Sequence, residues 1–180
     1  IRNRRARKPT CFTGTLRCAG RGFGRNILAA SGSYHPVYTL MRAHTTYRTF
    51  KTARRQEIID ITDDVEACRA AAGITEGMVL VSAMHISASV FVNDHEPGLW
   101  ADILDWLEQR IAPWDPEAYR HNSGTGEDNA AAHLRSLTIG HEVIVPVTAG
   151  KLDLGPWQRV FYGEWDGRRP KRVIFKAMGD

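Results

Sequence analysis

Hydrophobic and polar positions follow a sustained period only from about Thr45 onward. Seven segments after this point are rich in β-branched and aromatic residues or alternate between apolar and polar, as strands do. These predicted strands are residues 47–54, 57–61, 77–84, 86–92, 142–147, 157–165 and 172–178. Asp166-Gly167 lies between the last two and predicts a hairpin turn.

Three segments have helical spacing instead. Asp63 is expected to cap a short helix that ends at Gly73, with Glu66 completing a capping box. Residues 96–111 place apolar side chains three and four apart, which predicts one buried face before Pro113. A third helix is expected over residues 129–137, after a polar loop at 114–125. The pattern predicts an α+β fold: a mostly antiparallel, sandwich- or barrel-like sheet with two to three helices.

Charge divides the chain of 180 residues into two regions. Of its 24 Lys and Arg residues, 13 precede Glu57, where no Asp or Glu occurs; the remaining 11 stand against all 20 acidic residues. We therefore expect a basic, flexible N-terminal arm over residues 1–44 and one α+β domain over 45–180. The acidic balance of the domain argues against a nucleic-acid surface on it, so nucleic-acid binding is expected only through the arm.

The arm leaves the compartment open between two predictions. Arg-rich, acid-poor segments resemble transit peptides, which favours an organelle, whereas an arm without such a role favours the cytoplasm. Cys11, Cys18 and Cys68 form no paired spacing, which favours a reducing compartment, and Cys68 is expected in the core. No apolar run approaches the roughly 18 residues needed to span a membrane, so no membrane partner is expected.

Four of the seven histidines fall in predicted loops or at the ends of elements: His85, His95, His121 and His133. His121 and His133 bracket a glycine-containing loop and are able to converge on one metal or one phosphate. Spacing alone equally fits surface or hydrogen-bonded core histidines.

Other polar positions leave two interpretations open. Glu127 and Asp128 precede a helix, where acidic residues act as caps or orient a histidine. Asn93 and Asp94 follow a strand, where Asp94 caps the next helix or faces a site. In the segment 150–158, Trp157 is a core residue or a stacking surface for a ring.

A basic cluster follows the final turn: Arg168, Arg169, Lys171 and Arg172. Such clusters are usually a solvated face, and guanidinium groups also suit phosphate.

Three blocks of residues stand out by their order and spacing. The first is His85-Ile86-Ser87-Ala88-Ser89-Val90 with Asn93-Asp94. The second is His121 with Gly126-Glu127-Asp128-Asn129 and Ala132-His133-Leu134. The third is Pro146-Val147 with the segment 150–158, Glu164 and Arg169. Together they cover about Thr46 to Gly179, and in order and spacing they resemble the YjbQ family, which is linked to thiamine phosphate synthesis.

The resemblance implies a thiamine phosphate synthase-like transferase, which joins a pyrimidine diphosphate to a thiazole phosphate and releases pyrophosphate. It implies a homotrimer, a phosphorylated small-molecule substrate and a divalent cation, Zn or Mg, held by His85, His121 and His133. Asp128 is expected beside these catalytic histidines. The expected substrate contacts are Asn93, Asp94, Lys151, Trp157, Gln158 and Arg169.

Departures from the family pattern leave alternatives open. Ile86 replaces a threonine beside His85, Asp94 stands where glutamate is usual, and Pro156 replaces a threonine before Trp157. A different metal-dependent hydrolase of phosphoesters or other metabolites, or a trimeric binding protein without catalysis, fits the same residues.

Overall fold

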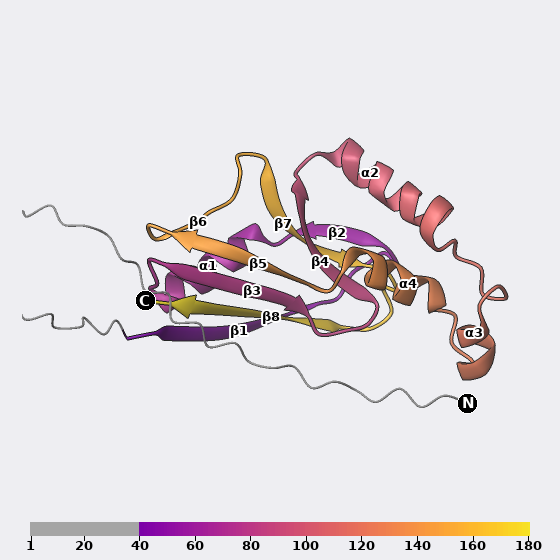
Figure 1. The fold of residues 1–180 in the computed structure, drawn as a ribbon. Helices are drawn as coiled ribbons and strands as arrows, with labels where there is room; N and C mark the ends of the chain where they lie inside the picture. Colours follow the sequence, from indigo (N-terminus) through magenta and orange to yellow (C-terminus); the bar gives the residue numbers. More distant parts are fainter. Residues whose placement is uncertain (1–39) are drawn as a thin grey trace, which may run out of the picture. The chain divides into compact units, whose positions relative to one another are not determined.

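The computed structural model describes residues 40–180, which form two antiparallel sheets and four α-helices (Figure 1). The larger sheet has five strands in the order β1-β8-β3-β5-β6. They are β1 Arg42–Phe50, β8 Lys171–Gly179, β3 Gly77–Ala83, β5 Glu142–Thr148 and β6 Lys151–Leu152. The smaller sheet has the order β2-β7-β4, made of β2 Glu57–Asp60, β7 Gln158–Glu164 and β4 Ala88–Asp94. The predicted α+β class with mostly antiparallel strands is confirmed.

Strands of both sheets share one hydrophobic core. Alternate residues of β3 and β5, such as Val79, Val81 and Val145, are buried, as are Val160 and Tyr162 of β7. The helix α1, Thr62–Ala72, adds further apolar side chains to this core, and Cys68 among them is 1% exposed, which confirms its predicted place.

A second cluster connects the helices to the smaller sheet. It contains Leu107, Ala132 and the fully buried Trp165, with Ile58 and Phe91 packed against them. Leu107 opens η1, the π-helical turn Leu107–Ile111 that continues α2 (Pro97–Trp106), and Ala132 belongs to α4 (Ala130–Ile139). Ser136 of α4 donates a hydrogen bond of 2.7 Å to the Ala88 carbonyl, so this packing fixes α4 beside the start of β4.

The predicted hairpin between the last two strands is wrong, because β7 and β8 lie in different sheets. Gly167 does turn the chain, with φ of 68°, and an added Cβ would lie 2.4 Å from the Arg55 Cα. The turn closes on a side chain: the Glu164 carboxylate accepts from the backbone N–H groups of Asp166 and Gly167, and β8 then pairs with β1 and β3.

Helix boundaries differ from the prediction mainly at the caps. The Asp60 carboxylate, and not Asp63, accepts from the first N–H of α1 at 2.9 Å, while Glu66 pairs with Arg69. Glu96, and not Asp94, accepts from the N–H groups that open α2. Gly73 ends α1 in the left-handed conformation, as predicted.

The predicted loop at 114–125 contains a short helix, α3, Arg120–Thr125. The first strand begins at Arg42, before the predicted residue 47, because it pairs with β8 over its whole length. Most of the predicted N-terminal arm, residues 1–39, lies outside the described residues. Within residues 40–180, no helix has the length and apolar character that crossing a membrane requires.

Candidate functional site

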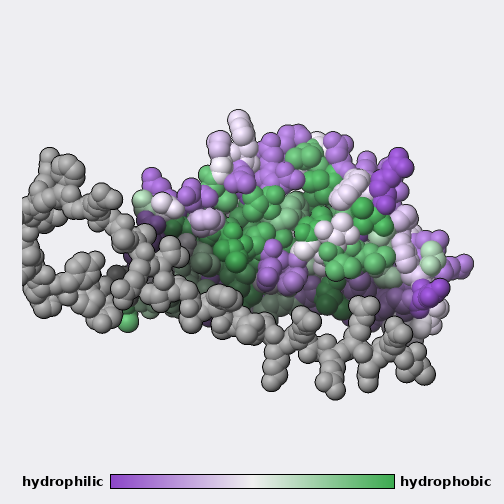
Figure 2. Space-filling view, in the orientation of Figure 1, coloured by the Kyte–Doolittle hydropathy of each residue, from purple (hydrophilic) through white to green (hydrophobic). Residues whose placement is uncertain are grey.

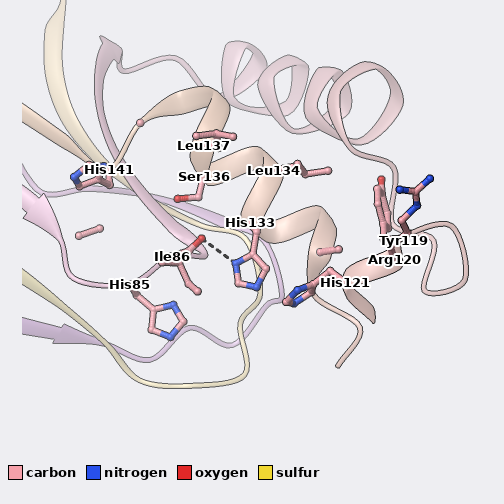
Figure 3. Close-up of a pocket in the computed structure, with 13 residues that line it drawn as sticks. His85, Ile86, Tyr119, Arg120, His121, His133, Leu134, Ser136, Leu137 and His141 are labelled. Carbon is pink, nitrogen blue, oxygen red and sulfur yellow. Dashed lines mark hydrogen bonds between the residues drawn. The ribbon is translucent and has the colours of Figure 1, made fainter. Parts of the chain in front are cut away.

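A cavity of about 740 Å³ lies between the loop after β3, the start of α3 and one side of α4. His85, His121 and His133 all line it, although they come from three separate segments of the chain. Figure 3 shows His133 between the other two rings. The rings of His121 and His133 meet edge to face, with centroids 4.8 Å apart.

One nitrogen of the His133 ring is held by the backbone. Its Nδ1 lies 3.1 Å from the Ile86 carbonyl oxygen, which only accepts hydrogen bonds (Figure 3). In the neutral ring Nδ1 therefore carries the proton, and Nε2 has a lone pair available to a ligand.

His121 is oriented by a chain of polar side chains. The Asn129 side-chain nitrogen donates to Glu127 at 2.5 Å, which turns the amide oxygen toward His121 Nε2 at 3.2 Å. Nε2 donates to that oxygen, so Nδ1 is the acceptor of the neutral ring. Glu127 is fixed in turn by Arg169 at 2.8 Å, and this hydrogen bond lowers the pKa of the Glu127 carboxyl.

His85 has the opposite polarity. Its Nδ1 accepts from the Ser87 N–H at 3.3 Å and lies 3.0 Å from the Ser87 hydroxyl, which leaves Nε2–H as a donor. Burial lowers the pKa of the His85 imidazole, and the positive charge of Lys171 lowers it further. The ring is therefore neutral at pH 7.

A buried ion pair supports the wall behind His85. Lys171 Nζ contacts Glu164 Oε1, with both side chains at most 1% exposed. The Tyr162 hydroxyl donates to the other Glu164 oxygen at 2.7 Å. Burial and then the Glu164 charge raise the pKa of Tyr162, so it stays protonated. The expectation that the basic cluster is solvated fails for Lys171, whose burial the linear sequence does not reveal.

The three histidines do not form a metal site. Among the side chains of residues 40–180, no group of three or more His, Cys, Asp or Glu is arranged to hold a metal ion. Within these residues the three histidines are therefore not arranged as the ligands of the predicted divalent cation, Zn or Mg. The cation itself stays a prediction.

Asp128 and Arg169 lie near the cavity without lining it. Asp128 accepts from Arg168 at 2.8 Å, and Arg169 donates to Glu127, so both acidic residues preceding α4 pair with arginines. The pairs with arginine were not predicted, and neither residue caps α4, but Glu127 does orient a histidine, because it holds the Asn129 amide against His121.

The remaining predicted substrate contacts lie elsewhere in the described chain. Asn93 lines a separate cavity of about 270 Å³, and the Asp94 carbonyl accepts from the Trp100 indole. Lys151 is exposed in β6, and Trp157 is 75% exposed and so does not belong to the core. The side-chain oxygen of Gln158 accepts a hydrogen bond from the Gly155 N–H. The structure does not bring these residues to the histidine cavity.

Residues that sequence reasoning did not select also line the cavity: Tyr119, Arg120, Ser136 and His141. His141 was visible only as one of seven histidines, and Arg120 lay in a segment interpreted as a loop. Since α3 was not predicted, no pattern indicated that Arg120 and His121 share an element.

Comparison with known proteins identifies relatives along most of the described region. The family model of the UPF0047 protein YjbQ-like matches residues 46–180. A UPF0047 protein of Archaeoglobus fulgidus is 45% identical over 130 residues, which is 72% of this chain and 98% of that protein. The UPF0047 protein YugU of Bacillus subtilis is 38% identical over 130 residues, or 72% of this chain and 95% of that protein.

Solved structures give the same result. A YbjQ-like protein of unknown function from Sulfolobus solfataricus matches with a TM-score of 0.72 and 34% identity, covering 78% of this chain and 100% of that one. A hypothetical protein from Aeropyrum pernix matches with a TM-score of 0.69 and 35% identity, over 76% of this chain and 98% of that one.

These findings correct the predicted activity. The relatives are named only as UPF0047 or YjbQ-like proteins, and none of these names refers to thiamine phosphate synthesis. The predicted metal centre is also not formed by the described residues. The prediction of a thiamine phosphate synthase in thiamine biosynthesis is therefore wrong. The resemblance that led to it is confirmed: the chain belongs to the YjbQ family of UPF0047 proteins.

Proposed function

We propose that this protein binds a small metabolite in the histidine cavity and catalyses proton transfer on it. The observation that carries the proposal is the pair of rings of His121 and His133, 4.8 Å apart in one cavity, each with a single nitrogen held by the fold. Each ring therefore presents its second nitrogen with a defined polarity, as acid–base catalysis requires.

His133 is the proposed general base. Its Nε2 lone pair takes a proton from the ligand, while the hydrogen bond from Nδ1–H to the Ile86 carbonyl holds the ring in place. The same nitrogen then returns the proton to the product. His121 Nδ1, on a ring whose centroid lies 4.8 Å from that of His133, is the second proposed acceptor in the cavity.

His85 is the proposed hydrogen-bond donor to the ligand. Loss of a proton leaves negative charge on a ligand oxygen, and a neutral imidazole N–H stabilises that charge without transferring its own proton. Burial and Lys171 keep His85 neutral, which suits this function.

Hydrogen exchange tests the proposal without knowledge of the physiological substrate. The full chain is incubated in D₂O with a panel of small carboxylates and phosphate monoesters, and deuterium uptake is measured by mass spectrometry. We expect uptake into at least one compound, and a loss of about 10²- to 10⁴-fold in the His133→Gln variant.

His95→Gln is the matched control, because His95 does not line the cavity, and it should exchange like the wild type. Compounds that bind in the cavity and show no catalysed exchange would refute the proposal, as would equal rates in the His133→Gln variant.

The homotrimer is a separate proposal, supported by the family resemblance. Light scattering of the full chain during gel filtration should give three times the monomer mass. A monomer at micromolar concentration would exclude it. The cytoplasmic location likewise stays a prediction.

A further inference from the structure

The wall of the histidine cavity is unusually apolar for a surface site. Ile86, Leu134 and Leu137 line it and are 73%, 40% and 80% exposed. Figure 3 shows Leu134 and Leu137 above the row of histidines and Ile86 between His85 and His133. On the face shown in Figure 2, hydrophobic surface gathers over α4, the helix that carries both leucines. A ligand that covers these aliphatic groups removes them from water.

The charged lining of the cavity is positive. Among the described lining residues there is no Asp or Glu, and Arg120 is the one Arg or Lys. Arg168 and Arg169 are neutralised by Asp128 and Glu127, whereas the Arg120 guanidinium forms no ion pair within the described region. Arg120 lies with His121 at one end of the cavity, and His141 lies at the other (Figure 3). One uncompensated positive charge favours a ligand with one anionic group.

We infer that the ligand is an amphipathic anion, with its acidic group near Arg120 and an aliphatic or aromatic body against Ile86, Leu134 and Leu137. The inference rests on the proposed function for the location of the site and adds the class of ligand. Ile86 determines which ligands the cavity prefers. Its side chain lies between His85 and His133 and replaces the threonine expected from the family pattern.

Binding of simple probes tests the ligand class. Isothermal titration of the full chain with acetate, butanoate and hexanoate should show affinity rising with chain length. The expected rise is about fifteenfold from butanoate to hexanoate, because these differ by two methylenes and each fully buried methylene adds roughly fourfold. Hexanoate should bind better than 1-hexanol and hexylammonium. Hexyl phosphate in the same series shows whether carboxylate or phosphate is the preferred anion.

Three variants assign the two ends of the ligand. Arg120→Gln should weaken hexanoate about fivefold to tenfold and remove its advantage over 1-hexanol. Ile86→Thr should weaken hexanoate about fivefold and leave acetate unchanged. Ile144→Thr is the matched control, since Ile144 is 60% exposed on β5 outside the cavity, and it should bind like the wild type.

Two results would overturn the inference. One is an affinity that does not depend on chain length, with tight binding only of hydrophilic anions. The other is an Ile86→Thr variant in which the mass of the oligomer in solution changes while the affinity for hexanoate does not. That result would mean that a second copy of the chain covers these side chains. Hexanoate binding without catalysed exchange of any compound would instead refute proton transfer and leave the ligand class intact.

Discussion

His95 and His133 both fall in predicted loops or at the ends of predicted elements, and the fold uses them differently. His95 Nδ1 contacts Asp60 at 2.7 Å, and its ring packs against Trp100 with centroids 4.7 Å apart. Arg159 completes that cluster by donating to the same Asp60 oxygen at 2.9 Å. His133 has one backbone partner and faces a cavity. Each ring has one nitrogen in a hydrogen bond, but His95 packs in a cluster with Asp60 and Trp100, whereas His133 lines a cavity in which a ligand can reach it.

The buried pair of Lys171 and Glu164 belongs to neither region, and its loss has the largest expected effect on stability. Lys171→Met leaves the Glu164 carboxylate buried without its cation, and we expect a loss of about 3–5 kcal/mol in the free energy of unfolding. Urea unfolding followed by circular dichroism measures it. The control Lys176→Met removes only a 3.3 Å contact to Thr45 and should change stability by less than about 1 kcal/mol. Equal losses in the two variants would contradict the role given to Lys171.

The Asp60 cluster should stabilise the fold in a pH-dependent way. Burial alone would raise the pKa of Asp60, but hydrogen bonds from Thr62, then Arg159 and His95, lower it to about 2 from 3.8. Because the folded pKa is the lower one, the stabilisation is present above pH 4 and is lost as the pH falls toward 2. Allowing for solvent screening, it is about 1 kcal/mol.

Asp60→Asn should therefore lower stability at pH 7 by about that amount and flatten the pH dependence between pH 4 and 2. Urea unfolding at several pH values tests this. A variant whose stability falls as steeply with acid as that of the wild type would show that other carboxyls control this range.

The fold was more predictable than the site, and the reasons are physical. Local alternation and spacing indicated almost every strand and the helices α1, α2 and α4, because those patterns report which face is buried. The prediction of a hairpin between β7 and β8 was wrong. Glu164, at the end of β7, caps the turn and pairs with Lys171, the first residue of β8, which lies in the other sheet. The pattern of apolar and polar residues along a sequence does not reveal such a buried pair.

The histidines show the same limit at the site. Sequence selected His85, His121 and His133, and the fold brings them to one cavity. It selected Lys151 and Trp157 by the same resemblance, yet they lie outside that cavity in the described chain. Arg120 was missed because a six-residue helix is too short to show a period.

His133→Gln should separate function from stability. Since His133 is partly exposed and makes a single hydrogen bond to a carbonyl, the substitution should cost less than about 1 kcal/mol of unfolding free energy. Thermal unfolding followed by circular dichroism checks this. If His133→Gln destabilised the protein more than His95→Gln does, the contrast between a structural and a reactive histidine would fail.

The smallest expected effect is that of His85 on stability in acid. Its folded pKa lies below the usual value of 6.5, so the unfolded chain binds the proton more tightly and stability falls as the pH drops below 6.5. An NMR titration of the ring should give a midpoint below 6.5. A midpoint at or above 6.5 would mean that neither burial nor Lys171 controls this imidazole.

The most direct test of the central claim is the tautomer of each cavity histidine, read from long-range ¹H–¹⁵N NMR correlations near pH 7.5. We predict a protonated Nδ1 for His133, with the neutral forms of His85 and His121 protonated on Nε2. A His133 ring protonated on Nε2, or rings that average between both tautomers, would contradict the proposed arrangement of donors and acceptors.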